Sequence, residues 1–375
     1  MISIKKEAVL ITPKDIKPTS KLLKVVGTFN PAAERLPNGD IVLYVRVAEM
    51  LRKIEDSKFC YSPRCSGKIK CNIKIDKIKK EDVESNSYFD CVLKDGTKRL
   101  TFISHLRRVI LDSSGFKGKS IDSKPTFHGL SHDGELGIED PRITKVGKDY
   151  YMTYVALSIE GNISTHLAKS KNCLNWKRLG PIFAEQNKDV VIFPEKIQGR
   201  YYAFNRPEGN FQFSPPHIWI SHSTDLIHWG HPRPVKLSKK GHWDYARVGA
   251  GSPPIKTSKG WLLLYHGVKE ESFNEGILDE SLAMPKKISI YSIGAALFDL
   301  KKPWKLIAKS PNPIIVPKKE YEKEGFVNNV VFSTDAVLDL DKKHLLIFSG
   351  GGDSVVSVKK ILLQDILNSL KKVKN

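Results

Sequence analysis

The sequence contains no run of about 18 apolar residues, which is close to the minimum for a helix that spans a membrane. Its first residues, MISIKKEAVLITPK, also lack the long apolar core of a secretory signal. We therefore expect a cytoplasmic protein without a membrane partner.

Cysteine is scarce, with five residues in a chain of 375. Four of them, Cys60, Cys65, Cys71 and Cys91, fall within one segment, and their spacing matches no standard zinc-binding pattern. Because a secretory signal is also lacking, we expect buried, reduced thiols here and neither disulfides nor a metal site.

Acidic residues are in the minority, with 41 Asp and Glu against 61 Lys and Arg, so the formal net charge is +20. Most of the excess is lysine scattered along the whole chain, which is typical of a solvated surface. The alternative is an anionic partner such as phosphate, a nucleotide or nucleic acid. Nucleic acid is not expected, because no block interleaves aromatic with basic residues and no zinc-finger spacing occurs.

No linker rich in Pro, Gly or Ser divides the chain, and its 40% of hydrophobic residues suffice for a core. We therefore expect one domain over residues 1–375. Within it, a turn followed by a short run of aromatic and β-branched residues occurs five times, and such runs are typical of strands. The runs cover residues 41–47, 150–156, 201–207, 261–268 and 344–350.

A second predicted strand follows each of these runs, at about residues 99–111, 162–170, 217–223, 289–300 and 354–362. Five strand-pair units in the same order favour an all-β fold, a five-bladed β-propeller, in which neighbouring sheets cover one another. A β-sandwich is the alternative, but it does not account for five matched copies.

Two segments depart from the repeat. Residues 50–98 separate the strands of the first unit, and we interpret them as a loop insertion over one face. Residues 362–373 carry apolar residues at helical spacing, which predicts a short amphipathic helix on the outside.

Polar residues interrupt the predicted strands. If the first strand of each blade lines a central channel, Arg46, Arg206 and His266 gather at one end of it. The run from Glu139 to Arg142, Glu-Asp-Pro-Arg, enters the second unit. Each of these has an ordinary structural interpretation, a turn with a salt bridge for the run and a core histidine for His266, but their recurrence at equivalent ends of different units favours a site.

Carboxylates together with cations suit the inverting cleavage of a glycosidic bond. An acid must protonate the leaving oxygen while a nucleophile attacks from the opposite face. Water as nucleophile requires a second carboxylate as base, whereas phosphate requires an anion site built from Arg, Lys and His. Arg46, Lys188, Arg206 and His266 are the candidates for such an anion site.

Several long stretches resemble glycoside hydrolase family 130, the mannoside phosphorylases and related β-mannosidases. They occur in the same order over residues 29 to about 354. The matching stretches are FNPA (29–32), IEDPRITKVGKDYYMTYVA (138–156), KDVVIFPEKIQGRYYAFNRP (188–207), HIWISHSTDLIHWG (217–230), GAGSPPIKTSKGWLLLYHGV (249–268), YSIGAALFDL (291–300) and EYEKEGFVNNVVF (320–332).

The resemblance implies a five-bladed propeller and an inverting reaction on β-mannosides. It implies that Asp140 is the general acid, acting through a sugar hydroxyl. It assigns phosphate binding to Lys188, Arg206 and His266 with help from Tyr291. It assigns mannose contacts to Asn30, Arg46, Arg142 and Asp299.

Three functions follow from this resemblance. The leading one is a phosphorylase that converts a β-linked manno-oligosaccharide and inorganic phosphate into α-mannose 1-phosphate and a shortened acceptor. The second is an inverting β-mannosidase, for which Glu195 and Asp244 are the acid–base pair to test. The third is a non-catalytic carbohydrate-binding propeller or a mannosyl transferase on the same scaffold.

Neither a metal nor an organic cofactor is required, because acid catalysis and an anion site supply the chemistry, and phosphate is a cosubstrate. The sequence leaves the linkage, β-1,2 or β-1,4, and the acceptor sugar open. It also leaves open a homo-oligomer, for which exposed loops and the C-terminal helix are the candidate surfaces.

Overall fold

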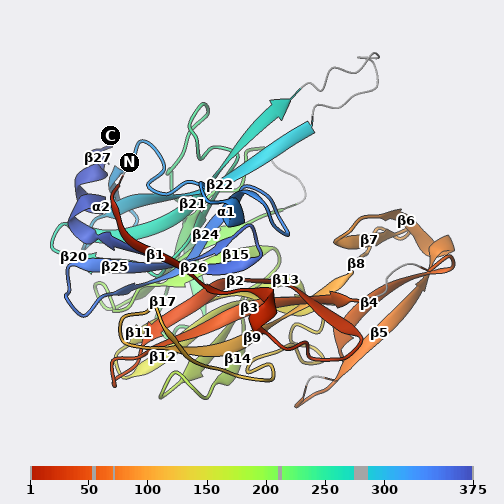
Figure 1. Cartoon of the computed structure of the whole chain (residues 1–375). Coiled ribbons are helices and arrows are strands. Elements are labelled where there is room, and N and C mark those ends of the chain that lie inside the picture. The colour runs from red at the N-terminus through yellow and green to blue at the C-terminus, as the bar shows by residue number, and fades with distance from the viewer. Residues whose placement is uncertain (1, 53–55, 71, 210–212, 274–285, 374–375) are drawn as a thin grey trace.

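The computed structural model of the protein describes residues 2–52, 56–70, 72–209, 213–273 and 286–373 (Figure 1). Strands dominate these ranges, which confirms the predicted all-β class. Their α-helices are α1 (Glu320–Lys323) and α2 (Leu363–Ser369), and short 3-10 helices lie at Pro13–Asp15 and Lys80–Asp82. None of the helices in the described ranges is long and apolar enough to cross a membrane.

Five antiparallel sheets carry most of the strands, and four of them have four strands each. The first runs β2 (Leu23–Arg35), β3 (Ile41–Leu51), β9 (Phe102–Leu111), β10 (Gly118–Ile121). The second runs β11 (Gly137–Val146), β12 (Asp149–Ser158), β13 (Asn162–Ser170), β14 (Lys177–Phe183). The third runs β15 (Asn187–Ile192), β16 (Tyr201–Pro207), β17 (Trp219–Ser223), β18 (Trp229–Pro234).

The two remaining large sheets contain the C-terminal half of the chain. One runs β19 (Arg247–Ala250), β21 (Gly260–Phe273), β22 (Lys286–Phe298), β23 (Leu306–Lys309), β27 (Lys371–Lys372), with β20 (Ile255–Thr257) paired to β21. The other runs β24 (Val331–Leu338), β25 (His344–Gly351), β26 (Val355–Leu362), β1 (Ile4–Ile11). This last sheet joins the first strand of the chain to three late ones, which ties the two ends of the sequence together.

The sheets are buried on both faces because their neighbours cover them. Every residue of β3 is buried, although side chains alternate between the two faces of a strand. Leu43 and Val45 pack into a core shared with β25 and β26, whereas Val42 and Tyr44 pack into a core shared with β11 and β12. A continuous apolar run is therefore required over residues 41–45 of this strand.

The five predicted strand pairs are confirmed, as β3–β9, β12–β13, β16–β17, β21–β22 and β25–β26. However, the prediction that the first member of each pair lines the centre is wrong. In the structure each is the second strand of its sheet, because β2, β11, β15, β19 and β24 precede them. These five preceding strands form the inner edges: β2 contacts β24 and β11, β15 contacts β11 and β19, and β24, of the fifth sheet, contacts β21 and β22 of the fourth.

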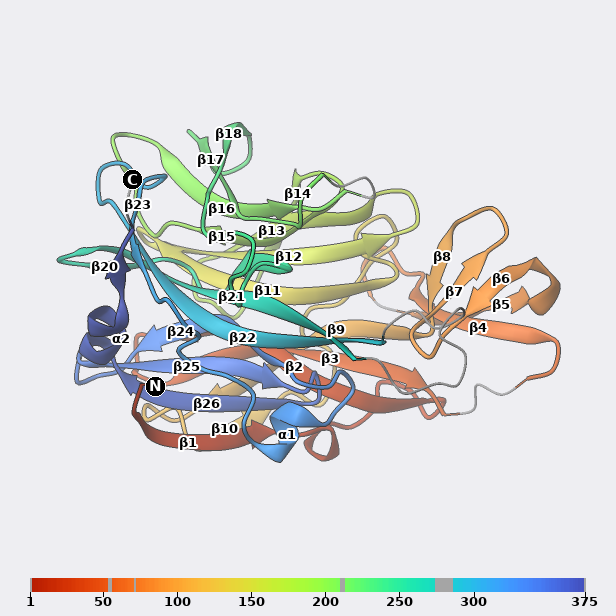
Figure 2. The same cartoon turned by 90° about the horizontal axis from the view of Figure 1, so that it is seen from above.

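The segment 50–98, expected as a loop, contains strands in its described part. β4 (Phe59–Cys65) pairs with β5 (Ile73–Lys79), and β6 (Val83–Asn86), β7 (Asp90–Leu93) and β8 (Lys98–Leu100) form a three-stranded sheet. These strands extend away from the other sheets as an arm in both views (Figures 1 and 2). The helix expected over 362–373 is shorter, since α2 ends at Ser369 and β27 follows.

The cysteines of the arm do not all follow the expectation of reduced thiols. Cys60 and Cys91 are free and buried, so the expectation is confirmed for them. Cys173, in the connection between β13 and β14, is also free and buried. The expectation is wrong for Cys65, which is disulfide-bonded. Cys71 lies outside the described residues.

One buried carboxyl group joins three of the inner strands. Asp335 of β24 is 2% exposed and its Oδ2 accepts hydrogen bonds from the backbone N–H of Ala33 in β2 and of Ile143 in β11, both at 3.1 Å. Its Oδ1 accepts a third from the N–H of Ala336. Each of the two inter-sheet donors would be buried without a partner if the carboxyl group were removed, which is costly.

We therefore expect Asp335→Ala to lower the free energy of unfolding by about 3 kcal/mol, measured by urea denaturation. The matched control is Asp95→Ala in the arm, whose exposed carboxylate accepts hydrogen bonds within a local turn, and it should cost less than about 1 kcal/mol. Equal losses in both variants would contradict a bridging role for Asp335.

Candidate active site

A β-bulge interrupts three of the inner strands at the same level. The pairing register shifts between Phe29 and Ala32 in β2, and likewise in β11 and β15. At these bulges Asn30, Asp140 and Asp189 adopt left-handed backbone conformations, with φ of 45°, 47° and 55°. Such conformations cost about 1–3 kcal/mol each outside glycine and mark functional sites when the surrounding fold maintains them.

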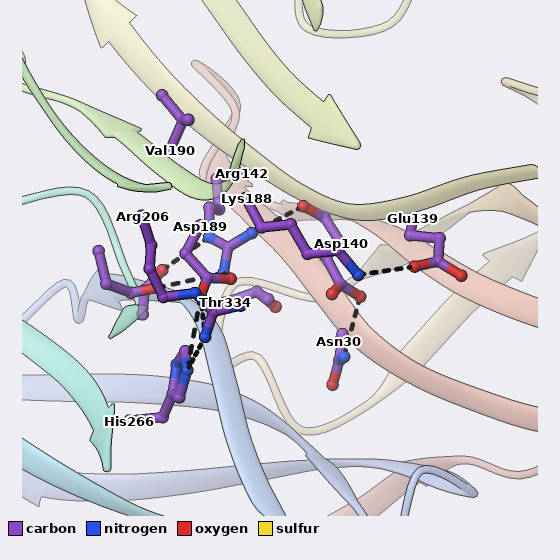
Figure 3. Close-up of polar contacts among 12 residues, drawn as sticks. Asn30, Glu139, Asp140, Arg142, Lys188, Asp189, Val190, Arg206, His266 and Thr334 are labelled. Carbon is purple, nitrogen blue, oxygen red and sulfur yellow. Dashed lines mark hydrogen bonds and ion pairs between the residues drawn. The ribbon is translucent and has the colours of Figure 1, made fainter. Parts of the chain in front are cut away.

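Proline contributes to two of these bulges. Pro31 and Pro141 follow the left-handed residues, and proline has no N–H to donate to a ladder, so it is tolerated where pairing is interrupted. The bulges turn Asn30 and Asp140 towards each other, and Asn30 Nδ2 donates to Asp140 Oδ1 at 2.9 Å (Figure 3).

A cavity of about 860 Å³ lies over these bulges. Its lining includes seven of the residues predicted from the sequence: Asn30, Arg46, Asp140, Lys188, Arg206, His266 and Tyr291. The arm contributes Phe89 and residues 96–100 to the same lining, and the segment after α1 contributes Phe326. The rings of Phe89 and Phe326 meet edge to face with centroids 4.8 Å apart, which joins the arm to the fifth sheet's side of the cavity mouth.

Asp140 lies among cations and is 9% exposed. Arg46 Nη1 donates to its Oδ1 at 2.9 Å, and the Nη2 of the same guanidinium binds Glu139. Although burial alone would raise the pKa of Asp140, Arg46, Arg142, Asn30 and then Lys188 lower it below its ordinary value. With these cations around it, the Asp140 carboxylate is ionised near neutral pH.

Asp189 holds two guanidinium groups in place beneath the cavity. Its Oδ1 accepts from Arg142 Nη2 at 2.8 Å, and its Oδ2 lies 3.1 Å from Arg206 Nη1 and 3.5 Å from His266 Nε2. Arg142 also donates to the carbonyl oxygen of Asp140 at 2.9 Å (Figure 3). This network fixes the backbone that carries the catalytic candidate.

A second carboxylate positions the cations on the opposite wall. Glu208 lies between Arg206, at 3.3 Å, and Arg247, at 2.9 Å, and Arg247 Nη1 donates to the hydroxyl of Tyr291 at 3.1 Å. Lys188 Nζ lies 3.9 Å from Glu139 Oε2. The cavity wall thus presents an ammonium, two guanidinium groups and a phenol, which together suit an oxyanion.

Asp353, which the sequence analysis did not assign, also lines the cavity. Burial raises its pKa to about 7, with Arg46 acting in the opposite direction and the carboxylates of Asp140 and Glu139 raising it further. Near neutral pH the Asp353 carboxyl group therefore takes up a proton more readily than an ordinary aspartate does. The Gly-Gly-Gly-Asp sequence that ends there was the available signal.

Two residues predicted to contact the sugar lie elsewhere. Arg142 is 1% exposed and is not part of the cavity lining, because it is held between Asp189 and backbone carbonyl groups. Asp299 lies at the end of β22, where it accepts from the backbone N–H of Lys301 and Lys302 in a turn. Neither side chain reaches the cavity.

The alternative acid–base pair is also outside the cavity. Glu195 is exposed and pairs with Lys256 on the surface. Asp244 is fully buried, where Ser238, Tyr265 and Lys309 satisfy it. The structure therefore does not place the carboxylates of Glu195 and Asp244 on either side of one substrate site, as an acid–base pair for glycosidic bond cleavage requires.

The further residues that the sequence analysis missed are Asp189, Glu208 and Arg247. Asp189 follows Lys188 as Asp140 follows Glu139, and this repeated acidic position at two bulges was a usable signal. No sequence signal pointed to Arg247 or Glu208. Among the described residues, no group of three or more His, Cys, Asp or Glu is arranged to hold a metal ion.

Known proteins resemble this chain over nearly its whole length. A family model described as β-1,4-mannooligosaccharide phosphorylase, of glycoside hydrolase family 130, matches residues 100–372. A β-1,2-mannobiose phosphorylase from Listeria innocua is 34% identical over 370 residues, with 96% of each chain covered. A 1,2-β-oligomannan phosphorylase from Thermoanaerobacter is 36% identical over 245 residues, which are 65% of this chain and 74% of that protein.

The solved structures agree with these matches. The structure of the Listeria innocua β-1,2-mannobiose phosphorylase in complex with β-1,2-mannobiose superposes with a TM-score of 0.82 at 32% sequence identity, covering 96% of each chain. The similarity therefore extends across all five large sheets and the arm.

The protonation of His266 provides a test of this geometry. Its ring is 1% exposed and lies 3.4 Å from Arg206 Nη1, and burial first, then Arg206, Arg142 and Arg247, lowers its pKa to about 3. We expect the imidazole to stay neutral down to pH 5 in an NMR titration, whereas an unperturbed histidine titrates near about 6.5. Because the unfolded state takes up the proton first, His266 should add stability as the pH rises from about 3 to 6.5. Titration near pH 6.5 would contradict the described packing.

Proposed function

Because this chain belongs to glycoside hydrolase family 130, we propose that it is a β-mannoside phosphorylase that cleaves a manno-oligosaccharide with inorganic phosphate. The observation that carries the proposal is the shared cavity. Asp140 lies in it together with Lys188, Arg206, Arg247 and Tyr291, so an acid and an oxyanion site face one space. A hydrolase would not require that cationic wall.

The reaction is an inverting displacement. A phosphate oxygen attacks the anomeric carbon, the bond from that carbon to the glycosidic oxygen breaks, and the leaving oxygen takes a proton that originates from Asp140, relayed by a sugar hydroxyl. The products are α-mannose 1-phosphate and a shortened acceptor. No metal is needed to activate the nucleophile, since phosphate is already an anion.

The low pKa of Asp140 fits an acid that is protonated only in the complex. The surrounding cations by themselves keep this carboxylate ionised. A phosphate dianion bound by Lys188 and Arg206 offsets their charge and raises the pKa of Asp140, so the proton is taken up with the substrates. Phosphate thus acts both as nucleophile and as the partner that prepares the acid.

The mannose contacts are assigned from the cavity lining. Asn30 and Arg46 adjoin Asp140. Asp353 replaces Arg142 and Asp299 in this role, because its pKa of about 7 makes the protonated form accessible, and that form can both donate to and accept from sugar hydroxyls. We assign a β-1,2 linkage, since the relative aligned over 96% of both chains is named for β-1,2-mannobiose. The family description names β-1,4-mannooligosaccharides, so both linkages enter the test.

We also assign the five large sheets to the five blades of a single propeller domain over residues 1–375. The ring of contacts among the inner strands supports this assignment, as does the pairing of β1 with β26, which closes the last sheet with the first strand of the chain. The site then occupies one end of the central axis, where the bulges of successive blades meet.

The first test is phosphate dependence. Purified protein is incubated with β-1,2- and β-1,4-mannobiose, with and without inorganic phosphate, and the products are separated. We expect mannose 1-phosphate from β-1,2-mannobiose only when phosphate is present. Free mannose in both tubes would identify a mannosidase, and sugar binding without turnover would identify a binding module. Transfer from a nucleotide sugar would identify a transferase.

The second test is Asp140→Asn, which removes the acid while keeping the hydrogen bonds of its neighbours. Loss of a general acid lowers kcat by about 10²–10⁴-fold, and we expect a fall in this range in protein that retains its circular dichroism spectrum. Asp299→Asn is the matched control, since this carboxylate lies in a turn outside the cavity, and its kcat should not change. Equal activity of both variants would remove Asp140 from the acid role.

A further inference from the structure

A smaller cavity of about 190 Å³ lies on the outer strands of the third sheet. Tyr202 of β16 and Ile220 and Ser221 of β17 line its floor, and Trp304, from the connection between β22 and β23, closes one side. Its remaining lining is Arg200, His222, His231 and Arg233. In Figure 2, β17 and β18 lie at the periphery of the molecule.

This cavity is separate from the candidate active site. Tyr202 and Arg206 are on the same strand, β16, and Arg206 lines the large cavity. Four residues of strand span about 13 Å, so the two cavities lie towards opposite ends of β16. No residue lines both of them.

The small cavity gathers positive charge without compensation. Arg200 Nη1 lies 2.9 Å from His222 Nε2, and the rings of His222 and His231 stack with centroids 4.6 Å apart. No carboxylate is part of this lining, and none of the four basic side chains forms an ion pair with another described residue. Burial, followed by Arg200, His231 and Arg233, lowers the pKa of His222.

The backbone and the aromatic rings fix these groups in place. His231 has a φ of 50° at an irregularity between β17 and β18, a strained conformation that directs its ring onto His222. The guanidinium of Arg233 lies over the Trp304 ring, 4.9 Å from its centroid. Stacking of this kind holds a guanidinium in plane and leaves its N–H groups free to bind an oxyanion.

We propose that this small cavity is a second oxyanion site, which binds one phosphoryl group, either as inorganic phosphate or as part of a sugar 1-phosphate. Its volume suits a single phosphoryl group, whereas pockets for whole cofactors measure about 300–1,000 Å³. Arg200 and Arg233 supply the forked donors that match tetrahedral oxyanions, and a bound anion offsets the charges of the two guanidinium groups. The proposal rests on this geometry and not on the proposed phosphorolysis.

The experiment is a calorimetric titration of the whole protein with inorganic phosphate. Wild type should bind two phosphates per chain. Arg206→Gln should lose phosphate binding in the large cavity. The double variant Arg200→Gln/Arg233→Gln should lose phosphate binding in the small cavity, hereafter the distal site, while its turnover is unchanged. The affinity of the distal site should fall by at least about tenfold, as expected for loss of one charge-assisted hydrogen bond.

The matched control is Lys196→Gln/Lys259→Gln, which removes two exposed charges that line neither cavity. It should bind as wild type does, and an equal loss in this control would overturn the proposal in favour of diffuse charge attraction. Binding of two phosphates per chain by the Arg200→Gln/Arg233→Gln variant, with unchanged affinities, would also overturn the proposal. If the large cavity binds no phosphate, the wild type binds one phosphate per chain, and Arg200→Gln/Arg233→Gln loses it while Arg206→Gln keeps it. Failure of the proposed function can therefore be told apart from failure of this second proposal.

Mannose 1-phosphate is the second probe, applied to Arg206→Gln so that only the distal site is available. If mannose 1-phosphate competes with inorganic phosphate, the sugar phosphate is an occupant of the small cavity. If it does not compete, the small cavity binds only the free anion. Should the double glutamine variant fail to fold, Arg200→Lys/Arg233→Lys keeps the charge but removes the forks. Undiminished affinity in that variant would contradict the assigned geometry.

Discussion

A chain of alternating carboxylates and guanidinium groups across the inner strands determines where everything else in the large cavity lies. It links four of the five sheets, in the order Glu139, Arg46, Asp140, Arg142, Asp189, Arg206, Glu208 and Arg247. Arg142 joins it through the backbone carbonyl oxygen of Asp140, and the network is buried as far as Arg206 and half-buried at Glu208 and Arg247. Removing one partner of a buried pair leaves an uncompensated charge, which is costly, so the members keep one another in place. The network therefore provides both the electrostatic field of the site and its rigidity.

The β-bulges make that network geometrically feasible. In regular strands the side chains at these positions would alternate between the cores of adjacent sheets, where an Asp is poorly tolerated. The left-handed conformations of Asn30, Asp140 and Asp189 instead place these side chains in the cavity lining, at a local conformational cost. The inter-sheet hydrogen bonds of Asp335 help to hold the inner strands together against that cost.

Much of the site was accessible from the sequence, but not its boundaries. Seven of the predicted residues line the cavity. Most of them, such as Asp140 before its proline, are polar residues that interrupt apolar strands, whereas Asn30 and Tyr291 were assigned from the family resemblance. Arg142, Asp299 and Asp244 failed for a common reason: the sequence does not tell whether a polar group faces solvent, a turn or a buried partner. Arg247 and Glu208 were missed because their roles depend on each other across two sheets.

The sequence by itself determined the all-β class, the five strand pairs and the polar interruption at Asp140, because each depends on short-range periodicity and turn chemistry. Only the tertiary structure decided which strand of each sheet is innermost, that the segment 50–98 forms strands at the cavity mouth, and which charges meet. These features depend on contacts between sheets that lie far apart in the chain. Periodicity determines the face to which a residue belongs, but it carries no information about the residue that it will oppose.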